Sequence, residues 1–204
     1  PVIDLAGEVA IVDIPHIEPG HDIELADLKE AGKNIRKEDI VFIRTAYFEK
    51  HPEWLTGDAF HANMPGLSVE AAKWLVREKN IRALGTDAIL ESFGIAKEYG
   101  FISHEVFYHN GVTMIDNLTN LSQIKSERPF VMMGLSMKVS GGDDSPARVI
   151  AFDGDGEKKR IVDCFLKMEP PVVPHRPPPL FEREEPSELR EEFMKLCMFH
   201  KSQL

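Results

Sequence analysis

Residues 103–121, SHEVFYHNGVTMIDNLTNL, predict a short helix followed by a strand. Ser103 is of a residue type that caps helix starts, and Gly111 stands where a glycine commonly ends a helix. The apolar run after this glycine is typical of a buried strand. His104 falls in the first helical turn and Asp116 just after the strand, so a reversal between the two elements can bring them together. An imidazole and a carboxylate at one place form a candidate metal-ligand pair.

The same alternation of helix and strand continues on both sides of this stretch. Apolar runs typical of strands, stretches with helical spacing and turn signals follow one another from the start of the chain to residue 168. This pattern predicts an α/β domain, residues 1–168, with a mixed or parallel sheet. The expected strands are 7–14, 39–45, 81–85, 112–115, 130–139 and 147–152, and the expected helices are 23–31, 68–79 and 103–110.

The composition changes at residue 169. A proline-rich run is typical of extended backbone, and residues 187–200 then have the spacing of a short amphipathic helix. We therefore expect an extension, residues 169–204, whose helix packs either on its own domain or on a second subunit.

Charge and cysteine content narrow the class of partner. The 204 residues carry a formal net charge of −10, which argues against nucleic acid or an anionic membrane as the main partner. No apolar run approaches the ~20 residues that span a bilayer. The two cysteines, Cys164 and Cys197, form no CxxC pair, which favours a reducing compartment such as the cytoplasm.

Each candidate residue also has an ordinary structural interpretation. His104 can be a helix-start or core histidine without a metal, and Asp116 can be a turn residue bonded to the backbone of Leu118. Asp87, at the end of an expected strand, is first a structural carboxylate and second a side chain that orients a ligand. Asn117 is either a turn former or such an orienting side chain.

Four stretches in order resemble one protein family. Residues 32–48 (GKNIRKEDIVFIRTAYF), 64–88 (MPGLSVEAAKWLVREKNIRALGTDA), 104–121 and 134–152 (GLSMKVSGGDDSPARVIAF) together resemble the cyclase family of metal-dependent hydrolases. Kynurenine formamidase and isatin hydrolase belong to this family. The resemblance implies a swivelling β/β/α fold and a homodimer or homotetramer.

The resemblance also implies a divalent-metal site, with zinc first and manganese or magnesium as alternatives. In the family one metal is held by a His and a Glu twelve positions apart, in the pattern H…NGI.IIENL. His104 matches the His, and Asp116 stands at the Glu position with the same spacing. The carboxylate is kept but is one methylene shorter. Asp87 matches the aspartate of the family's G-x-D.

One family motif is absent from this sequence. H-x-G-T-H-x-D-x-P-x-H supplies two His ligands, a bridging Asp and the His that acts as general acid and base. We therefore predict no catalytic residue within this sequence and expect the motif in a segment before Pro1.

The activity implied is hydrolysis of an aryl formamide or cyclic amide, as by N-formylkynurenine formamidase in tryptophan catabolism. The substrate would be a small aromatic amide, and Phe101, Phe107 or Tyr108 would stack on it. The alternative is an inactive homologue that acts as a binding or scaffold protein.

Overall fold

The computed structural model describes residues 6–52, 58–92, 96–97, 100–133, 144–154, 156, 160–161 and 163. The chain divides into two units, Pro1–Pro174 and His175–Leu204, and every described residue belongs to the first. The predicted proline-rich extension and its helix lie outside the described residues. No helix in the described part of the chain is both long enough and apolar enough to cross a membrane.

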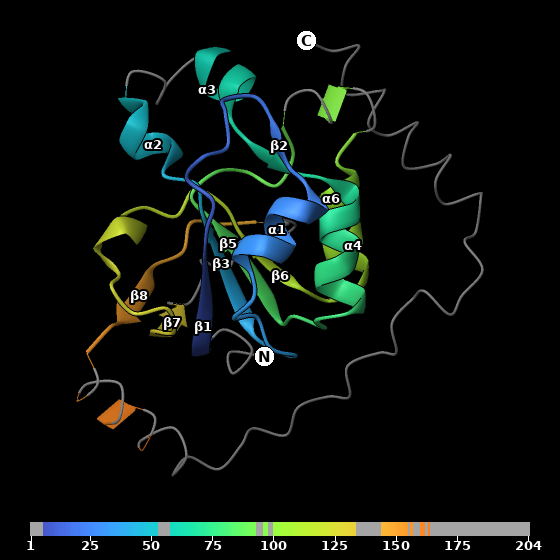
Figure 1. The fold of residues 1–204 in the computed structure, drawn as a ribbon. Coiled ribbons are helices and arrows are strands. Elements are labelled where there is room, and N and C mark those ends of the chain that lie inside the picture. The colour runs from blue at the N-terminus through green and yellow to red at the C-terminus, as the bar shows by residue number, and fades with distance from the viewer. Residues whose placement is uncertain are drawn as a thin grey trace. The chain divides into compact units, whose positions relative to one another are not determined.

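A six-stranded sheet forms the centre of this unit (Figure 1). Its strand order is β6-β5-β3-β1-β7-β8, and the first four strands in this order run parallel. β7 pairs antiparallel with β1, and β8 pairs antiparallel with β7. The mixed sheet confirms the predicted α/β class. The strands are β1 Ala6–Asp13, β3 Ile40–Arg44, β5 Ala83–Thr86, β6 Thr113–Ile115, β7 Phe130–Met133 and β8 Val149–Phe152.

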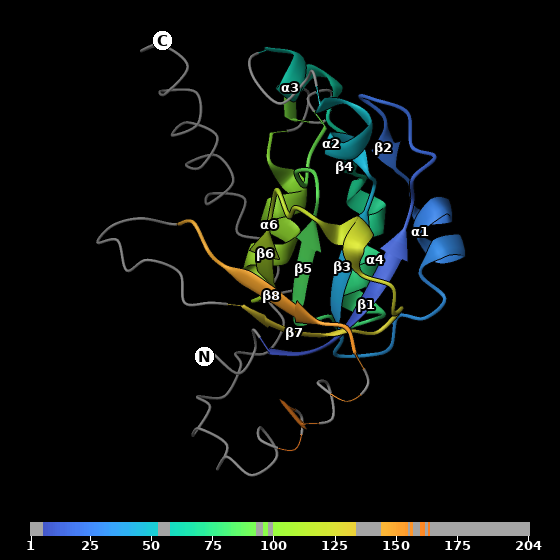
Figure 2. The same ribbon diagram turned by 90° about the vertical axis from the view of Figure 1, so that its left-hand side faces the viewer.

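Three helices connect the parallel strands: α1 Leu25–Ala31, α4 Val69–Arg77 and α6 Ile102–His109. All three lie on one face of the sheet, whereas β7 and β8 curl over the other (Figures 1 and 2). Each new parallel strand is added on the same side of the previous one. Because such crossovers are right-handed, every connecting helix is placed on the same face.

The sheet therefore separates two apolar clusters. On the helical face, Leu28, Leu75 and Phe107 are completely buried against alternate residues of the parallel strands. On the opposite face, Phe42 packs with Leu118 and with residues of β1 and β7. Strands that are apolar on both faces are typical of such a buried parallel sheet, which is why the run at 40–43 is continuous.

Helix α4 follows the sequence prediction closely. Ser68 accepts a hydrogen bond from the backbone N–H of Ala71 at 3.4 Å, so it caps the helix as expected. The apolar residues of α4 are buried on one side, including Trp74, Leu75 and Val76. Burial of this side against α1 and α6 gives the helix its stability.

The connection at 47–65 contains two short helices. These are α2 Tyr47–Lys50 and α3 Asp58–Asn63. They span four and six residues, too few to show helical periodicity in the sequence. After them comes the short strand β4 Gly66–Leu67, which pairs parallel with β2 Asp22–Ile23 in a separate two-stranded sheet.

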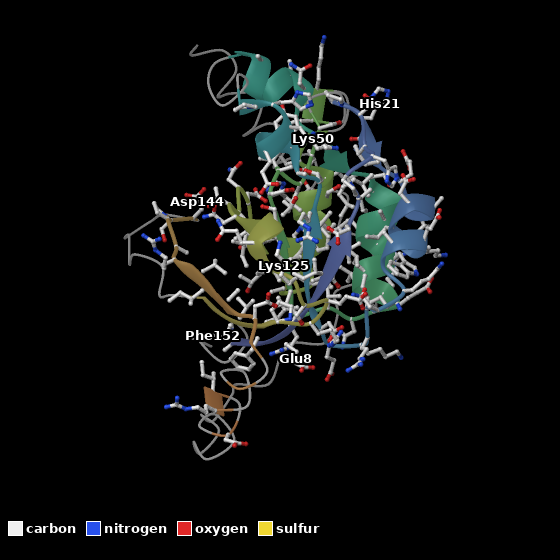
Figure 3. All side chains as sticks on the ribbon, turned by 60° about the vertical axis from the view of Figure 1, so that its left-hand side comes forward. Glu8, His21, Lys50, Lys125, Asp144 and Phe152 are labelled. Carbon is white, nitrogen blue, oxygen red and sulfur yellow. The ribbon has the colours of Figure 1, made fainter. Side chains whose placement is uncertain are left out.

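The two ends of the central sheet carry different segments. Figure 3 shows Glu8 and Phe152 at one end, in agreement with the register of β1, β7 and β8. His21 and Lys50 lie toward the other end, where the Lys50 ammonium donates to the carbonyl of Pro15. This second end is where the parallel strands finish. Ligand sites of open α/β sheets commonly lie outside this carboxyl edge.

Candidate functional site

His104 and Asp116 meet at the carboxyl edge of the sheet. Helix α6 returns the chain from this edge, so its first turn lies there, and β6 brings the chain back to the same edge. His104 is in that first turn and Asp116 follows the last residue of β6. The distance from His104 Nε2 to Asp116 Oδ2 is 3.6 Å. The two predicted ligands are therefore adjacent, as the helix-to-strand reversal requires.

The start of α6 differs from the prediction. Ser103 is not the N-cap, because the helix begins at Ile102 and Phe101 occupies the cap position without a side-chain hydrogen bond. The hydroxyl of Ser103 is buried and donates to the carbonyl of Leu67 at 3.0 Å. This tertiary bond explains the error, since a side chain committed to β4 is not available to cap its own helix.

The far end of α6 agrees with the prediction. Gly111 has a left-handed backbone, with φ 64°, and its N–H donates to the carbonyl of Tyr108. β6 is half-buried rather than fully buried, because it is the edge strand of the sheet. Asn117 then turns the chain, with φ 58°, and its N–H donates to the carbonyl of Ala88 at 2.9 Å. This bond fixes the backbone beside Asp116.

The third member of the site is Glu91, which the sequence patterns did not indicate. Its carboxylate accepts a hydrogen bond from the backbone N–H of His104 at 2.7 Å and contacts Nδ1 of the same imidazole. The Glu91 side chain is only 1% exposed. The only signal in the sequence was an acidic residue following a strand, which does not reveal a partner thirteen positions away.

The two carboxylates determine the charge of His104. Burial of the imidazole lowers its pKa, but the interactions with Asp116 and Glu91 outweigh burial and raise the pKa from 6.5 to about 9. A neutral histidine at this position would leave two carboxylates facing an uncharged ring. The site therefore attracts positive charge, either a proton or a cation, at Nε2.

Asp87 has the structural role that was its first interpretation. Its carboxylate accepts hydrogen bonds from the backbone N–H and the hydroxyl of Thr45, at 2.9 and 2.7 Å, and from the N–H of Ala46 at 2.8 Å. Ala46 has a left-handed backbone with φ 58°, which these bonds hold in place. Burial raises the pKa of Asp87. Asp87 thus orders the end of β3.

The donor set fits two positions of a metal site. The 3.6 Å between His104 Nε2 and Asp116 Oδ2 is close to the ~3.4 Å that separates two ligands of a tetrahedral ion with bonds of about 2.1 Å. Asp116 Oδ1 is buried and has no hydrogen-bond partner in the described part of the chain. Glu91 contacts the opposite ring nitrogen, so it cannot share an ion bound at Nε2. No group of three His, Cys, Asp or Glu among the described residues is arranged to hold a metal.

The aromatic residues near the site differ in their exposure to solvent. Phe107 is completely buried in the core, so the prediction that it stacks on a substrate is wrong. Phe101 is 57% exposed, and its ring lies edge-on to His104 with centroids 5.8 Å apart. Tyr108 is also exposed and lies two turns further along α6.

Comparisons with known proteins agree on the fold. Residues 1–90 match the family model described as "Putative cyclase". Isatin hydrolase A from Labrenzia aggregata, solved with benzyl benzoate, is 23% identical with a TM-score of 0.60, covering 74% of this chain and 62% of that chain. Isatin hydrolase A from Ralstonia solanacearum is 19% identical with a TM-score of 0.62. The match covers 74% of this chain and 61% of that chain.

A structure described as a novel cyclase is 19% identical with a TM-score of 0.53, covering 72% of this chain and 53% of that one. No curated protein matches the sequence. The chain thus spans about 61–62% of the length of the isatin hydrolases, and the likeness to them shows the fold.

Proposed function

We propose that this chain, whose residues 1–90 match the cyclase family model, forms part of a metal-dependent hydrolase that opens a cyclic amide or cleaves an aryl formamide. The observation that carries the proposal is the placement of His104 Nε2 beside Asp116, whose second oxygen is buried without a partner among the described residues. Isatin, the substrate named for the similar structures, is itself a cyclic amide.

His104 and Asp116 would hold the divalent cation, with zinc as the first choice and manganese or magnesium as alternatives. Such a cation, when bound, polarises an amide carbonyl and lowers the pKa of water to about 7. A hydrolytic site needs at least one further protein ligand and an acid–base group, which would come from other residues of the whole protein. Asp116 contributes negative charge, and its shorter side chain keeps its carboxylate close to β6.

The substrate side of the proposal rests on Phe101. This exposed ring, next to His104, offers an apolar surface on which an aromatic amide would pack. Isatin and N-formylkynurenine both combine an aromatic ring with an amide, so they are the two substrates to test. The proposal includes tryptophan catabolism through kynurenine only if the second compound is the better substrate.

A second candidate function is that of an inactive homologue acting as a binding or scaffold protein. It is favoured by one observation, that the described residues supply two metal donors and no group of three. A protein with only these two donors would bind a divalent cation weakly and would not hold a water for hydrolysis.

The test compares His104→Ala with His109→Ala, because both histidines belong to α6 and His109 is exposed at its far end. The variants are made in the whole protein, including any segment that precedes Pro1. We expect the parent and His109→Ala to bind zinc or manganese and to hydrolyse isatin or N-formylkynurenine, and His104→Ala to lose both properties. Metal content is measured by mass spectrometry and turnover by absorbance. A parent protein without metal or turnover in added zinc and manganese refutes the hydrolase and leaves the scaffold. Full metal occupancy in His104→Ala refutes the role of this residue.

The assembly expected from the family, a homodimer or homotetramer, is also part of the proposal. Ile150, on the edge strand β8, is 48% exposed, which supports contact with a second copy. Light scattering coupled to size-exclusion chromatography decides the oligomeric state, and a monomer at micromolar concentration contradicts it.

A further inference from the structure

Glu91 is an acidic residue in an unusual position. It is 1% exposed, and acidic side chains are rarely buried so completely unless they are paired. Both of its carboxylate oxygens face one residue: Oε1 accepts from the backbone N–H of His104, and Oε2 contacts Nδ1 of the His104 ring. Glu91 therefore binds both the helix and the side chain of its partner.

The surrounding backbone fixes Glu91 in this position. The N–H of Leu67 donates to the carbonyl of Leu90 at 2.8 Å, and the hydroxyl of Ser103 donates to the carbonyl of Leu67 at 3.0 Å. The short strand β4 thus joins the segment of Glu91 to the first turn of α6. Gly66 lies so close to Glu91 that a Cβ there would be 2.9 Å from its Cα.

The hydrogen-bond chemistry of a carboxylate then selects one form of the ring. An ionised carboxylate only accepts hydrogen bonds, so Nδ1 must carry a proton to bond with it. A neutral ring carries one proton, and two carboxylates could accept it. The Glu91 contact at Nδ1 is the closer, whereas Nε2 lies 3.6 Å from Asp116 Oδ2, so the proton stays on Nδ1 and Nε2 keeps its lone pair. Metal-binding histidines are oriented by such a bond to the nitrogen that does not bind the metal.

We propose that Glu91 is a positioning residue that fixes the tautomer of His104, keeping the proton on Nδ1 and directing Nε2 toward a divalent cation beside Asp116. The inference rests on the proposed function for the cation, but the tautomer can be measured without one. The competing interpretation is that Glu91 only caps α6, since it satisfies a backbone N–H in the first turn.

Glu91→Gln separates the two roles. The backbone N–H of His104 can only donate, so the new side chain must present its carbonyl oxygen there and its NH2 group to the ring. The ring nitrogen Nδ1 must then accept, which moves the proton of the neutral ring to Nε2. The helix cap is kept, whereas the tautomer is inverted and the metal-binding nitrogen is blocked. Glu78→Gln is the matched control, because Glu78 accepts a bond from the Trp74 indole at 3.0 Å and lies at the end of α4, away from the first turn of α6.

The experiment records long-range proton–nitrogen NMR spectra of the full chain labelled with 15N-histidine, without metal, in alkaline solution where the His104 ring is neutral. We expect the Nδ1–H form in the parent and in Glu78→Gln, and the Nε2–H form in Glu91→Gln. Calorimetry with zinc should then show an affinity reduced about 10–100-fold in Glu91→Gln and unchanged in Glu78→Gln.

An Nε2–H tautomer in the parent overturns the proposal, and this result does not depend on the variant folding. An unchanged tautomer in a folded Glu91→Gln overturns it as well, and leaves the capping role. If the tautomer inverts but neither protein binds zinc, the positioning role stands and the proposed metal centre fails. If the parent binds zinc and the His104 tautomer is the same in the parent and in Glu91→Gln, the metal centre stands and the positioning role fails.

Discussion

Gly66→Ala should displace Glu91 without altering any residue of the site. A Cβ at this position would lie 1.9 Å from the backbone nitrogen of Ser92 and 2.5 Å from the carbonyl carbon of Glu91. Ordinary contact begins at 3.4 Å, so the two backbones must separate by about 1.5 Å. The neighbouring atoms belong to the backbone and cannot move aside as a flexible side chain can.

The cost follows from two contributions. Overpacking of a buried contact destabilises a protein by about 1–3 kcal/mol. A shift of this size also breaks the 2.7 Å bond between Glu91 and the His104 N–H, a bond to a charged group worth about 1.5–3 kcal/mol. We therefore expect the free energy of unfolding to fall by about 2.5–6 kcal/mol.

The assay is urea unfolding followed by circular dichroism, with Gly156→Ala as the control. A Cβ at Gly156 meets nothing within 4 Å, so this control should change stability by less than about 0.5 kcal/mol. A Gly66→Ala protein as stable as the control would show that the close approach of β4 to Glu91 is not a constraint, and the reasoning would be refuted.

Three further predictions concern charge, burial and the core. In metal-free protein, folding raises the pKa of His104 from 6.5 to about 9. Protonated His104 therefore adds at most about 3 kcal/mol to the free energy of unfolding. This stabilisation is complete below pH 6.5 and is lost as the pH rises through 9. Urea midpoints across this range test it, and a flat profile contradicts it. Asp87→Ala leaves the buried donors of Thr45 without an acceptor and should lower the free energy of unfolding by about 2–4 kcal/mol, measured by the same method; a loss below 1 kcal/mol contradicts it. Phe107→Ala should cost about 3–5 kcal/mol because the ring is fully buried. Phe101→Ala should change the free energy of unfolding by less than about 0.5 kcal/mol, because this ring is exposed. Thermal melts of the two variants test the difference, and equal losses of stability in Phe107→Ala and Phe101→Ala contradict it.

Much of the fold could be predicted from the sequence, because the parallel strands and the longer connecting helices carry clear apolar patterns. The continuous run at 40–43 indicated a strand buried on both faces, and Ser68 indicated the start of α4. The helices α2 and α3 are too short to show a period. Strand order was also not predictable, because it depends on pairing between distant segments such as β1 and β7.

The candidate site could be predicted in part for the same reason. His104 and Asp116 belong to one helix–strand unit, so local geometry brings them together. Glu91 reaches His104 only through contacts of β4 with two other segments, and no local pattern encodes such an arrangement. Ser103 was misassigned because its hydroxyl bonds to Leu67 instead of its own helix.

The central position of β1 has a consequence for the order of folding. Its partner on one side, β3, follows about 30 residues later, whereas its partner on the other side, β7, follows more than 100 residues later. Closing the longer loop costs about 1 kcal/mol more in chain entropy, and non-local pairings form late. We expect β7 and β8 to join the sheet last during refolding, and their amide protons to exchange with solvent before those of β3 and β5.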